Sequence, residues 1–473
     1  MRAFLFPIIF LLATAAFAQP AKPNFIFILA DDLGYGELGS YGQKLIQTPH
    51  LDRMAAEGMR FTQFYAGSTV CAPSRSVLMT GQHLGHTTVR GNAGGRNMDA
   101  QSLKASDVTV ARVLQQSGYA TSLIGKWGLG ELDQPGEPRK QGFDHYFGFL
   151  SQTHAHNHYP SFLFRTGERV TLPNDLTQVG SHEGSGYATK RLVYAGDLFV
   201  KEAAEFIEKN RSRPFFLYYS IVTPHANNER SRVLGEGNEV PDQGIYKDKP
   251  WHDSAKNHAA MVTRLDRDVG ELFALLKRLG LDEKTMVMFT SDNGPHREGG
   301  PNYDPAFFNV SGPFSGIKRS LTDGGIRVPF LARWPGKIKA GTTSEHVGYF
   351  GDIMATYTEL AGVKAPANLD SISLVPTLLG RGQQKKHEYL YWEFYEQGVS
   401  QAVLLDGRWK AIRLKTPTAP IQLFDVKNDP AEKTDVAAKN ARIVARAENI
   451  MKTARHDNEH WKLTSPPGSA PAP

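Results

Sequence analysis

Asn24-Phe25-Ile26-Phe27-Ile28-Leu29-Ala30-Asp31-Asp32 is an apolar run that stops at two carboxylates, and it decides the fold that this sequence predicts. The run is too short for a typical helix and does not alternate with polar residues, which is typical of a parallel strand buried on both faces. A second such run, Thr285 to Thr290, ends in Ser291-Asp292-Asn293-Gly294. Because ligands of open α/β sheets bind at the carboxyl ends of the strands, the two polar pairs can converge although they lie far apart in the sequence.

Helical and strand patterns alternate through the large region around these runs. Helices are expected from Thr48-Pro49, from Asp107 as a capping residue, over Ala195 to Asn210, and along a stripe from Val262 to Leu276. Strands are expected over Tyr119 to Ile124 and Pro214 to Val222. This alternation predicts an α/β fold with a large, mostly parallel sheet flanked by helices. Residues 142–190 and 225–258 are expected to be long functional loops.

Composition divides the chain into four parts. Residues 1–18 have a charged start, an apolar stretch and the small-residue end Ala16-Phe17-Ala18 of a secretory signal peptide. Residues 19–380 form the expected large α/β domain, which would be the catalytic one. Residues 381–464 open with a linker and are expected to form a small C-terminal α+β domain with a short antiparallel sheet and a helix from Ala431 to Ala454. Residues 465–473, rich in Pro, Ala and Ser, are expected to be a disordered tail.

The composition favours anionic substrates and disfavours both a nucleic-acid-binding arm and a membrane span. The 54 Lys and Arg residues exceed the 48 Asp and Glu residues, and the net charge of +6 favours anionic substrates. No block of like charges predicts a nucleic-acid-binding arm. After the signal segment no stretch approaches the roughly 20 apolar residues of a membrane span, so we expect an exported protein, periplasmic or secreted, without a membrane span.

The single cysteine, Cys71, lies in Val70-Cys71-Ala72-Pro73-Ser74-Arg75, which leads to Thr80-Gly81. Pro73 suits the first turn of a helix, whose free N–H groups and macrodipole would place Cys71 in an anion site with Arg75 one turn on. A buried structural cysteine beside a helix start is the alternative. A lone thiol in an oxidising compartment is a liability unless it is buried, reactive or modified.

The two strand ends also offer a metal site. Their three carboxylates and one amide are oxygen donors without a His or Cys spacing pattern: Asp31, Asp32, Asp292 and Asn293. Such donors suit a hard cation, Ca²⁺ first and Mg²⁺ second, rather than Zn²⁺. The alternative is that each pair is only a polar strand end or a helix cap.

With these residues the chain resembles the type I sulfatase family of the alkaline phosphatase superfamily, over nearly all of its mature length. Cys71-Ala72-Pro73-Ser74-Arg75 with Thr80-Gly81 matches the family signature C-x-P-S-R…T-G. The resemblance implies an alkaline-phosphatase-like fold and a formylglycine-generating maturation enzyme that oxidises Cys71 to formylglycine, whose hydrated aldehyde is the nucleophile. It also implies that the four oxygen donors at the strand ends bind Ca²⁺ together with modified Cys71.

Four further residues receive roles by the same resemblance. Arg75 would hold the hydrated aldehyde in place. Lys126, in Gly125-Lys126-Trp127, and Lys318, in Gly316-Ile317-Lys318, match the two sulfate-binding lysines of the family. His225, in Thr223-Pro224-His225, matches the histidine near the bridging oxygen, which would be a general acid for the leaving alkoxide.

The chain departs from the family in the motif G-K-W-H-L-G, because Gly128 stands where the histidine is expected. In the family that histidine helps the sulfated intermediate to collapse and release sulfate. Our hypothesis is that His296 takes over this role, with His154 or His156 as the next candidates. His83 and His86, after Thr80-Gly81, are expected to serve packing or to lie in solvent.

The sequence thus predicts an exported sulfatase, a sulfuric ester hydrolase that uses formylglycine and bound Ca²⁺. A sulfated carbohydrate is the expected substrate, because the chain is exported and basic and carries side chains suited to sugars: His154, His156, His158, Tyr159, Trp392 and Phe394. One alternative is a phosphate or phosphonate ester hydrolase of the same superfamily, which the absence of two-zinc histidines disfavours. The other is a sulfated-glycan-binding protein without catalysis, which Gly128 motivates.

Overall fold

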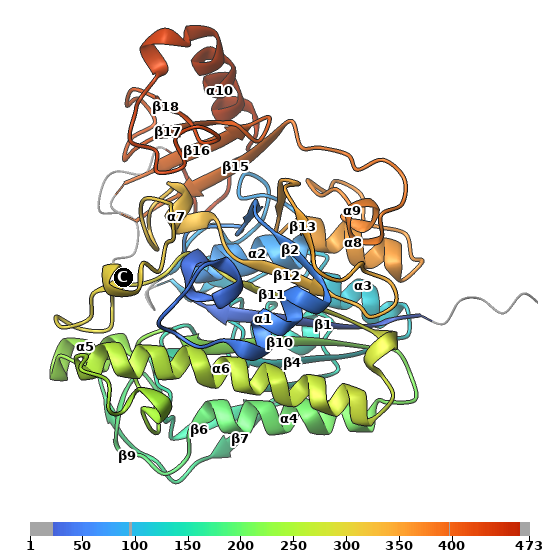
Figure 1. Ribbon diagram of the computed structural model, residues 1–473, viewed down its shortest axis with the longest axis vertical. Helices are drawn as coiled ribbons and strands as arrows, with labels where there is room; N and C mark the ends of the chain where they lie inside the picture. Colours follow the sequence, from blue (N-terminus) through green and yellow to red (C-terminus); the bar gives the residue numbers. More distant parts are fainter. Residues whose placement is uncertain (1–21, 94–96, 397, 464–473) are drawn as a thin grey trace, which may run out of the picture.

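A ten-stranded sheet crosses the larger part of the molecule in the computed structural model, which describes residues 22–93, 97–396 and 398–463 (Figure 1). Its strands are β1 (Asn24–Asp31), β2 (Met59–Phe61), β4 (Ala120–Lys126), β5 (His145–Phe149), β6 (Phe162–Arg165), β7 (Glu168–Thr171), β10 (Phe215–Pro224), β11 (Thr285–Ser291), β12 (Phe330–Arg333) and β13 (Thr342–Ser344). They lie in the order β13-β2-β12-β11-β1-β10-β4-β5-β6-β7. The central strands from β11 to β5 are parallel, and antiparallel pairs flank them at β12 and β6. The predicted large sheet is confirmed, with its parallel part at the centre.

Strand β1 shows why its sequence is apolar between Phe25 and Ala30. Phe25, Phe27 and Leu29 belong to the hydrophobic core on one face of the sheet, whereas Ile26 and Ile28 belong to the core on the other. Successive side chains of a strand point to opposite faces, so a strand with a core on each side has no position for a polar residue.

Helices cover both faces of the sheet. The first core includes residues of α2 (Cys71–Thr80), α3 (Val110–Gln116) and α8 (Asp352–Leu360). The second includes residues of α1 (Pro49–Glu57), α4 (Ala195–Lys209) and α6 (Asp253–Arg278), and Figure 1 shows α4 and α6 running side by side. The shorter helices are α5 (Asn228–Leu234), α7 (Asp323–Ile326) and α9 (Val375–Leu379).

A second, antiparallel sheet follows in the C-terminal part. It consists of β15 (Tyr389–Phe394), β16 (Ser400–Leu405), β17 (Trp409–Arg413) and β18 (Gln422–Asp425), paired in chain order and packed against α10 (Ala441–Thr453). Tyr391 belongs to the small core beneath α10, whereas Trp392 belongs to the first core of the large sheet. The predicted short antiparallel sheet is confirmed.

The segment 142–190, expected as a long loop, contains five strands. Besides β5, β6 and β7 it forms the hairpin of β8 (Asp175–Gln178) and β9 (Gly186–Lys190). Strands β7, β8 and β9 are short and largely exposed, so they lack the apolar runs that revealed the central strands. The segment 225–258 likewise contains α5 and the start of α6. A further short pair is β3 (Phe64–Tyr65) with β14 (Gly348–Tyr349).

Two helix starts differ from the prediction, and at each a side chain accepts hydrogen bonds from nearby backbone N–H groups. Thr109, not Asp107, caps α3 by accepting from the backbone N–H of Arg112 at 3.1 Å. Helix α10 begins at Ala441 rather than Ala431. Ahead of it, the Asp429 side chain accepts from the backbone N–H groups of residues 433 and 434, at 2.8 Å each. Such local side-chain bonds compete with helix formation.

The predicted signal segment, residues 1–18, and the predicted tail, residues 465–473, lie outside the described residues. Within the described part of the chain, no helix is both long enough and apolar enough to cross a membrane.

Candidate active site

Four neighbouring parallel strands end at one edge of the sheet, and each end carries a polar residue. Strand β1 ends at Asp31, which Asp32 follows, and β11 is followed by Asp292-Asn293. Strand β4 ends at Lys126, and β10 is followed by His225. The edge is held together by the backbone N–H of Asp32, which donates to Asp292 Oδ1 at 3.1 Å. Residues from four distant parts of the sequence therefore meet because their strands are parallel and adjacent.

Helix α2 brings Cys71 to this edge. Cys71 is the first residue of α2, which is buried along its whole length, and its Sγ lies 3.4 Å from Asp31 Oδ1. Burial raises the pKa of the Cys71 thiol well above its usual value, although nearby Lys126 opposes the shift. The unmodified thiol is therefore neutral at pH 7, and the position does not by itself create a reactive thiolate.

Arg75, one turn along α2, fixes the helix to the strand ends. Its Nε and Nη2 donate to Asp292 Oδ2 at 3.1 and 2.8 Å. Its Nη1 donates to the carbonyl oxygen of Lys126 at 2.8 Å and to Ser220 Oγ at 2.5 Å. All these groups are buried, so the guanidinium is held by fixed partners from β4, β10 and the end of β11.

Two buried lysines neutralise the carboxylates of β1. Lys126 Nζ donates to Asp31 Oδ2 at 2.6 Å, and Lys318 Nζ donates to Asp32 Oδ2 at 2.7 Å. Burial alone would lower the pKa of each lysine, but Asp31 raises that of Lys126, and Asp32 with Glu298 raises that of Lys318. Both ammonium groups stay charged near neutral pH. Three carboxylates at this edge thus face three cations, counting Asp292 and Arg75.

His225 lies between Lys318 and the backbone of its own loop. Its Nδ1 is 2.6 Å from the carbonyl oxygen of Ala226 and therefore carries the proton that it donates there. Its Nε2 is then the acceptor for Lys318 Nζ at 3.1 Å. Burial, together with Lys318 and Lys126, holds the pKa of His225 well below its usual value, so the ring is neutral.

The strand ends fit a bound cation. Ligand atoms of Asp31, Asp32, Cys71 and His225 all lie within 4.8 Å of one another, so this buried cluster could hold a metal ion. Asn293 Oδ1 is buried and accepts no hydrogen bond from any residue that the structure describes. Carboxylate and amide oxygens suit hard cations, and an ion would satisfy the orphaned Asn293 oxygen.

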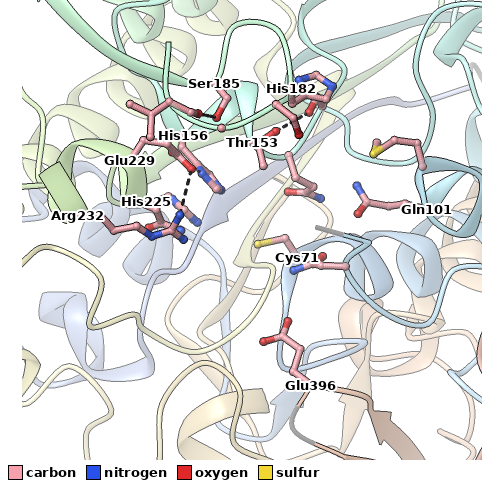
Figure 2. Close-up of a pocket in the computed structure, with 18 of the residues that line it drawn as sticks. Cys71, Gln101, Thr153, His156, His182, Ser185, His225, Glu229, Arg232 and Glu396 are labelled. Atoms are coloured by element: carbon pink, nitrogen blue, oxygen red, sulfur yellow. Dashed lines mark hydrogen bonds and ion pairs between the residues drawn. The ribbon is translucent and has the colours of Figure 1, made fainter. Parts of the chain in front are cut away.

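A cavity of about 300 Å³ opens over Cys71. Figure 2 shows Cys71 with His156, His225, Glu229 and Arg232 on one side and Gln101 on the other. His156 Nδ1 lies 3.0 Å from Glu229 Oε2, and the rings of His156 and His225 stack with centroids 4.7 Å apart. The cavity therefore joins the charged edge of the sheet to a polar wall.

Comparisons with known proteins identify the family. A family model described as Sulfatase matches residues 23–363, and one described as N-sulphoglucosamine sulphohydrolase, C-terminal, matches residues 315–457. This chain belongs to the sulfatase family. It is a sulfuric ester hydrolase, as the sequence predicted, and the resemblance to type I sulfatases is confirmed.

Relatives and solved structures agree with that identification. The sulfatase is 34% identical to N-acetylgalactosamine-6-sulfatase of Mus musculus over 415 residues, which covers 85% of this chain and 74% of the mouse protein. Its structure is similar to the crystal structure of Ps i-CgsB in complex with k-i-k-neocarrahexaose, with a TM-score of 0.76, 28% identity, and coverage of 94% of this chain and 95% of that one. A phosphonate monoester hydrolase of Agrobacterium radiobacter has the same fold, with a TM-score of 0.62, 20% identity, and coverage of 91% and 95%.

The three histidines considered as replacements at Gly128 lie in different surroundings. His296 is buried, its Nε2 is 3.0 Å from the carbonyl oxygen of Pro224, and its Nδ1 accepts from the backbone N–H of Glu298 at 3.1 Å. Both ring nitrogens of His296 are therefore engaged by the backbone. Burial lowers the pKa of His154 to about 3, and its ring packs on Phe149. Only His156 of the three lines the cavity over Cys71.

Most side chains expected to contact a sugar serve the interior instead. Trp392 is in the core and donates Nε1–H to the carbonyl oxygen of Ala66 at 2.9 Å. His158 is buried with its Nε2 2.7 Å from the carbonyl oxygen of His225, so it positions that loop. The others in the interior are His154, Tyr159 and Phe394. His156 alone of this set faces the cavity, because aromatic and imidazole rings in loops are also the means of packing those loops.

The structure adds residues that the sequence did not reveal. Glu298 accepts from Lys318 Nζ at 3.1 Å and pairs with Arg319, which in turn pairs with Glu396 at 2.6 Å. Arg319 and Glu396 line the cavity, as does Gln152. None of these residues lies in a recognisable motif; the one available signal is that Arg319 follows the motif lysine directly.

Proposed function

We propose that this sulfatase is exported and hydrolyses the sulfate ester of a sulfated carbohydrate, using formylglycine made from Cys71 and a bound Ca²⁺. The observation that carries the proposal is the convergence of Cys71 with buried oxygen donors and three cations at one edge of the sheet, where Cys71 and Lys318 also line the cavity. Residues 1–18 have the features of an export signal, which supports a periplasmic or secreted location.

Asp31, Asp32, Asp292 and Asn293, with modified Cys71, would hold the ion. Bound there, Ca²⁺ would supply positive charge to a sulfate oxygen and lower the pKa of the attacking hydroxyl. The maturation enzyme would supply the hydroxyl itself by converting the Cys71 side chain to an aldehyde that hydrates. The raised pKa of the unmodified thiol is consistent with a residue that acts after modification.

The chain's own cations would bind and orient the sulfate group. Arg75 and Lys126 hold the Cys71 end of the site, since Arg75 is bonded to the carbonyl oxygen of Lys126. Lys318 Nζ carries protons and lies against His225 Nε2. When the bond from sulfur to the bridging oxygen breaks, this pair can pass one proton to the leaving alkoxide. Lys318 and His225 would therefore act together as the general acid.

His156 is the better-placed of the candidate bases for releasing sulfate. Glu229 holds its Nδ1, which leaves Nε2 as the acceptor nitrogen. His296 remains a residue that positions the loop before Lys318, because both its nitrogens are bonded to backbone groups. Replacing His156 by Ala should slow sulfate release after the first turnover and leave a burst, whereas replacing His296 should lower stability.

The cavity wall favours a polyhydroxylated substrate over a small apolar one. Among its lining groups are Ser185, His182, Glu229 and Arg232, which can bond to hydroxyl and sulfate groups. The relatives support the same class, since the mouse protein is named for N-acetylgalactosamine and the solved complex contains a neocarrahexaose. A sulfated sugar is thus the proposed substrate.

Sulfate release from a panel of sulfated oligosaccharides, beside 4-nitrophenyl sulfate and 4-nitrophenyl phosphate, tests this proposal. We expect faster release from one oligosaccharide than from the aryl sulfate, and negligible phosphate release. Arg232→Ala should raise KM for that oligosaccharide about tenfold and leave KM for the aryl sulfate unchanged, because Arg232 is half exposed at the cavity. Faster phosphate than sulfate release would favour the phosphohydrolase alternative.

A further inference from the structure

The structure shows what fills the space beside Gly128. Gly128 has a φ of 78°, and a Cβ built on it would lie 2.1 Å from Gln152 Nε2 and 2.8 Å from Gln152 Cδ. The amide of Gln152 therefore occupies the place where a side chain at position 128 would begin. A histidine at position 128 and the Gln152 side chain would therefore occupy the same volume.

The local backbone explains this placement. The segments that follow β4 and β5 stay paired beyond the strand ends. The N–H of Trp127 donates to the carbonyl oxygen of Phe149 at 2.9 Å, and the N–H of Gly128 donates to the carbonyl oxygen of Leu150 at 3.0 Å. Gln152 comes two residues after Leu150 and so returns over Gly128. Gln101 supports the turn from the other side, since its Nε2 donates to the Gly128 carbonyl oxygen at 3.2 Å.

The Gln152 amide is buried, and its nitrogen has no hydrogen-bond partner among the described residues. The residue is only 8% exposed, and its Nε2 finds no hydrogen-bond partner in the described ranges 22–93, 97–396 and 398–463. An unpaired buried amide costs about 1–3 kcal/mol, so a native structure retains one where a ligand completes it. Gln152 and Cys71 line the same cavity, and the ligand proposed for that cavity is an anion rich in acceptor oxygens.

We propose that Gln152 takes the place of the missing histidine as a positioning residue, donating its Nε2–H to the bound sulfate group. The inference rests on the proposed function of the site and names a residue that the family motif does not contain. An amide neither gains nor loses a proton near pH 7, so Gln152 orients the anion and leaves proton transfer to other groups.

The first test measures anion binding without turnover. Inorganic sulfate is titrated by calorimetry into protein carrying Cys71→Ser, with and without Gln152→Ala. We expect about tenfold weaker sulfate binding in the double variant, the loss of one hydrogen bond to an anion. Because no paired group is removed, the melting temperature without sulfate should not fall. The exposed Gln47→Ala, in the same Cys71→Ser background, is the matched control and should bind sulfate unchanged.

A companion variant separates positioning from packing. Gln101 lines the same cavity, but both ends of its amide are paired, with Nε2 on Gly128 and Oε1 accepting from the N–H of Ala93 at 2.8 Å. Gln101→Ala should therefore lower the melting temperature, whereas Gln152→Ala should not. A fall in melting temperature for Gln152→Ala with unchanged sulfate affinity would mean that Gln152 only packs, and would overturn the inference.

The second test restores the family arrangement in active enzyme. Gln152→Ala should lower kcat/KM about tenfold to a hundredfold. Gly128→His added to it should recover part of the loss, because the side-chain volume is then free; the φ of 78° at this position strains the substitution, so full recovery is not expected. The double variant should also show one additional titrating group in its pH–rate profile, near the ordinary histidine pKa of about 6.5. Gly128→His alone should be impaired, since its side chain meets the Gln152 amide.

Failure of the role of Gln152 and failure of the proposed function give different outcomes in these tests. Equal sulfate affinity with and without Gln152, in protein that binds sulfate, overturns the role of Gln152 alone. Absence of sulfate binding in the Cys71→Ser protein, together with absence of sulfate release by the parent enzyme, overturns the proposed function itself. Weaker binding in the Gln152 variant with partial rescue by Gly128→His supports both.

Discussion

The two ends of helix α2 use the same kinds of side chain for opposite purposes. At its N-terminal end, Cys71 and Arg75 meet the buried carboxylates Asp31 and Asp292 at the ends of two strands. At its C-terminal end, Gly81 closes the helix with a φ of 69°, and a cluster formed by His83, His86 and Asp370 follows.

The second cluster is an anchor. The Asp370 carboxylate accepts from the backbone N–H of His83 at 3.0 Å and lies 2.8 Å from His86 Nδ1. His86 stacks on His456, whose backbone N–H donates to the carbonyl oxygen of Gly85 at 3.0 Å. These contacts fasten the segment after α10 to the helix that carries Cys71. The comparison shows that carboxylates near one helix can belong to the candidate active site at one end and hold two parts of the fold together, with histidines, at the other.

Removing the nucleophile should have the largest effect and should act on rate alone. Cys71→Ala leaves the cations and the cavity in place but removes the group that is proposed to attack sulfur, so sulfate release should fall at least about 10⁴-fold. Initial rates of sulfate release measure this, with thermal unfolding as the control for folding. Retention of more than about one hundredth of the parent rate would mean that another residue attacks.

Removal of the ion should have the next largest effect on the rate of sulfate release. This effect should arise at the N-terminal end of α2. Dialysis against a chelator should lower the rate about 100-fold or more, and Ca²⁺ should restore it better than Mg²⁺, because the donors are carboxylate and amide oxygens. The melting temperature should rise with added Ca²⁺ by mass action. Full activity in protein shown by elemental analysis to be free of metal would contradict the assignment of these ligands.

Acid should weaken the C-terminal end through His83. Burial lowers the pKa of His83 to about 4, against about 6.5 in an unfolded chain. The folded state thus binds fewer protons than the unfolded state between those values. The stability present above pH 6.5 therefore falls as the pH drops through 4, by about 3–4 kcal/mol at most. Urea unfolding at several pH values should show a shallower fall for His83→Asn. The partly exposed His460→Gln, as the control, should keep the parent slope.

Loss of the anchor carboxylate should have the smallest effect. Asp370→Asn weakens two hydrogen bonds at the C-terminal end, so the free energy of unfolding should drop by about 1–2 kcal/mol, while kcat stays within about threefold of the parent. Asp457→Asn, at a carboxylate that is 93% exposed, should change stability by less than about 0.5 kcal/mol. A kcat loss as large as that from chelation would show that the two ends of α2 are coupled.

The sequence predicted the strand ends well because parallel strands carry a physical signature. Strands buried on both faces are apolar at every position, so Asp31 and Asp292 stand out as the points where the runs stop. Lys126 and His225 follow predicted strands, but their roles came from the resemblance to the family motifs. The fold of the catalytic edge was therefore readable from local patterns.

Other features depended on information that no local pattern holds. Gln152 lies over Gly128 because the segments that follow β4 and β5 stay in register, and the whole sheet sets that register. Glu298 joins the site through Lys318 and Arg319, and Glu396 joins it through Arg319, by contacts between distant loops. The half-exposed strands β8 and β9 were taken for loop, because their sequences do not bury a continuous face.

The account depends most directly on the chemical state of Cys71. Mass spectrometry of the peptide that contains Cys71, from protein produced in a host with the maturation enzyme and releasing sulfate, measures that state. The account predicts a peptide with the lower mass of an aldehyde in place of the thiol, in a fraction that rises with specific activity. Unmodified thiol alone in active protein would contradict the formylglycine mechanism.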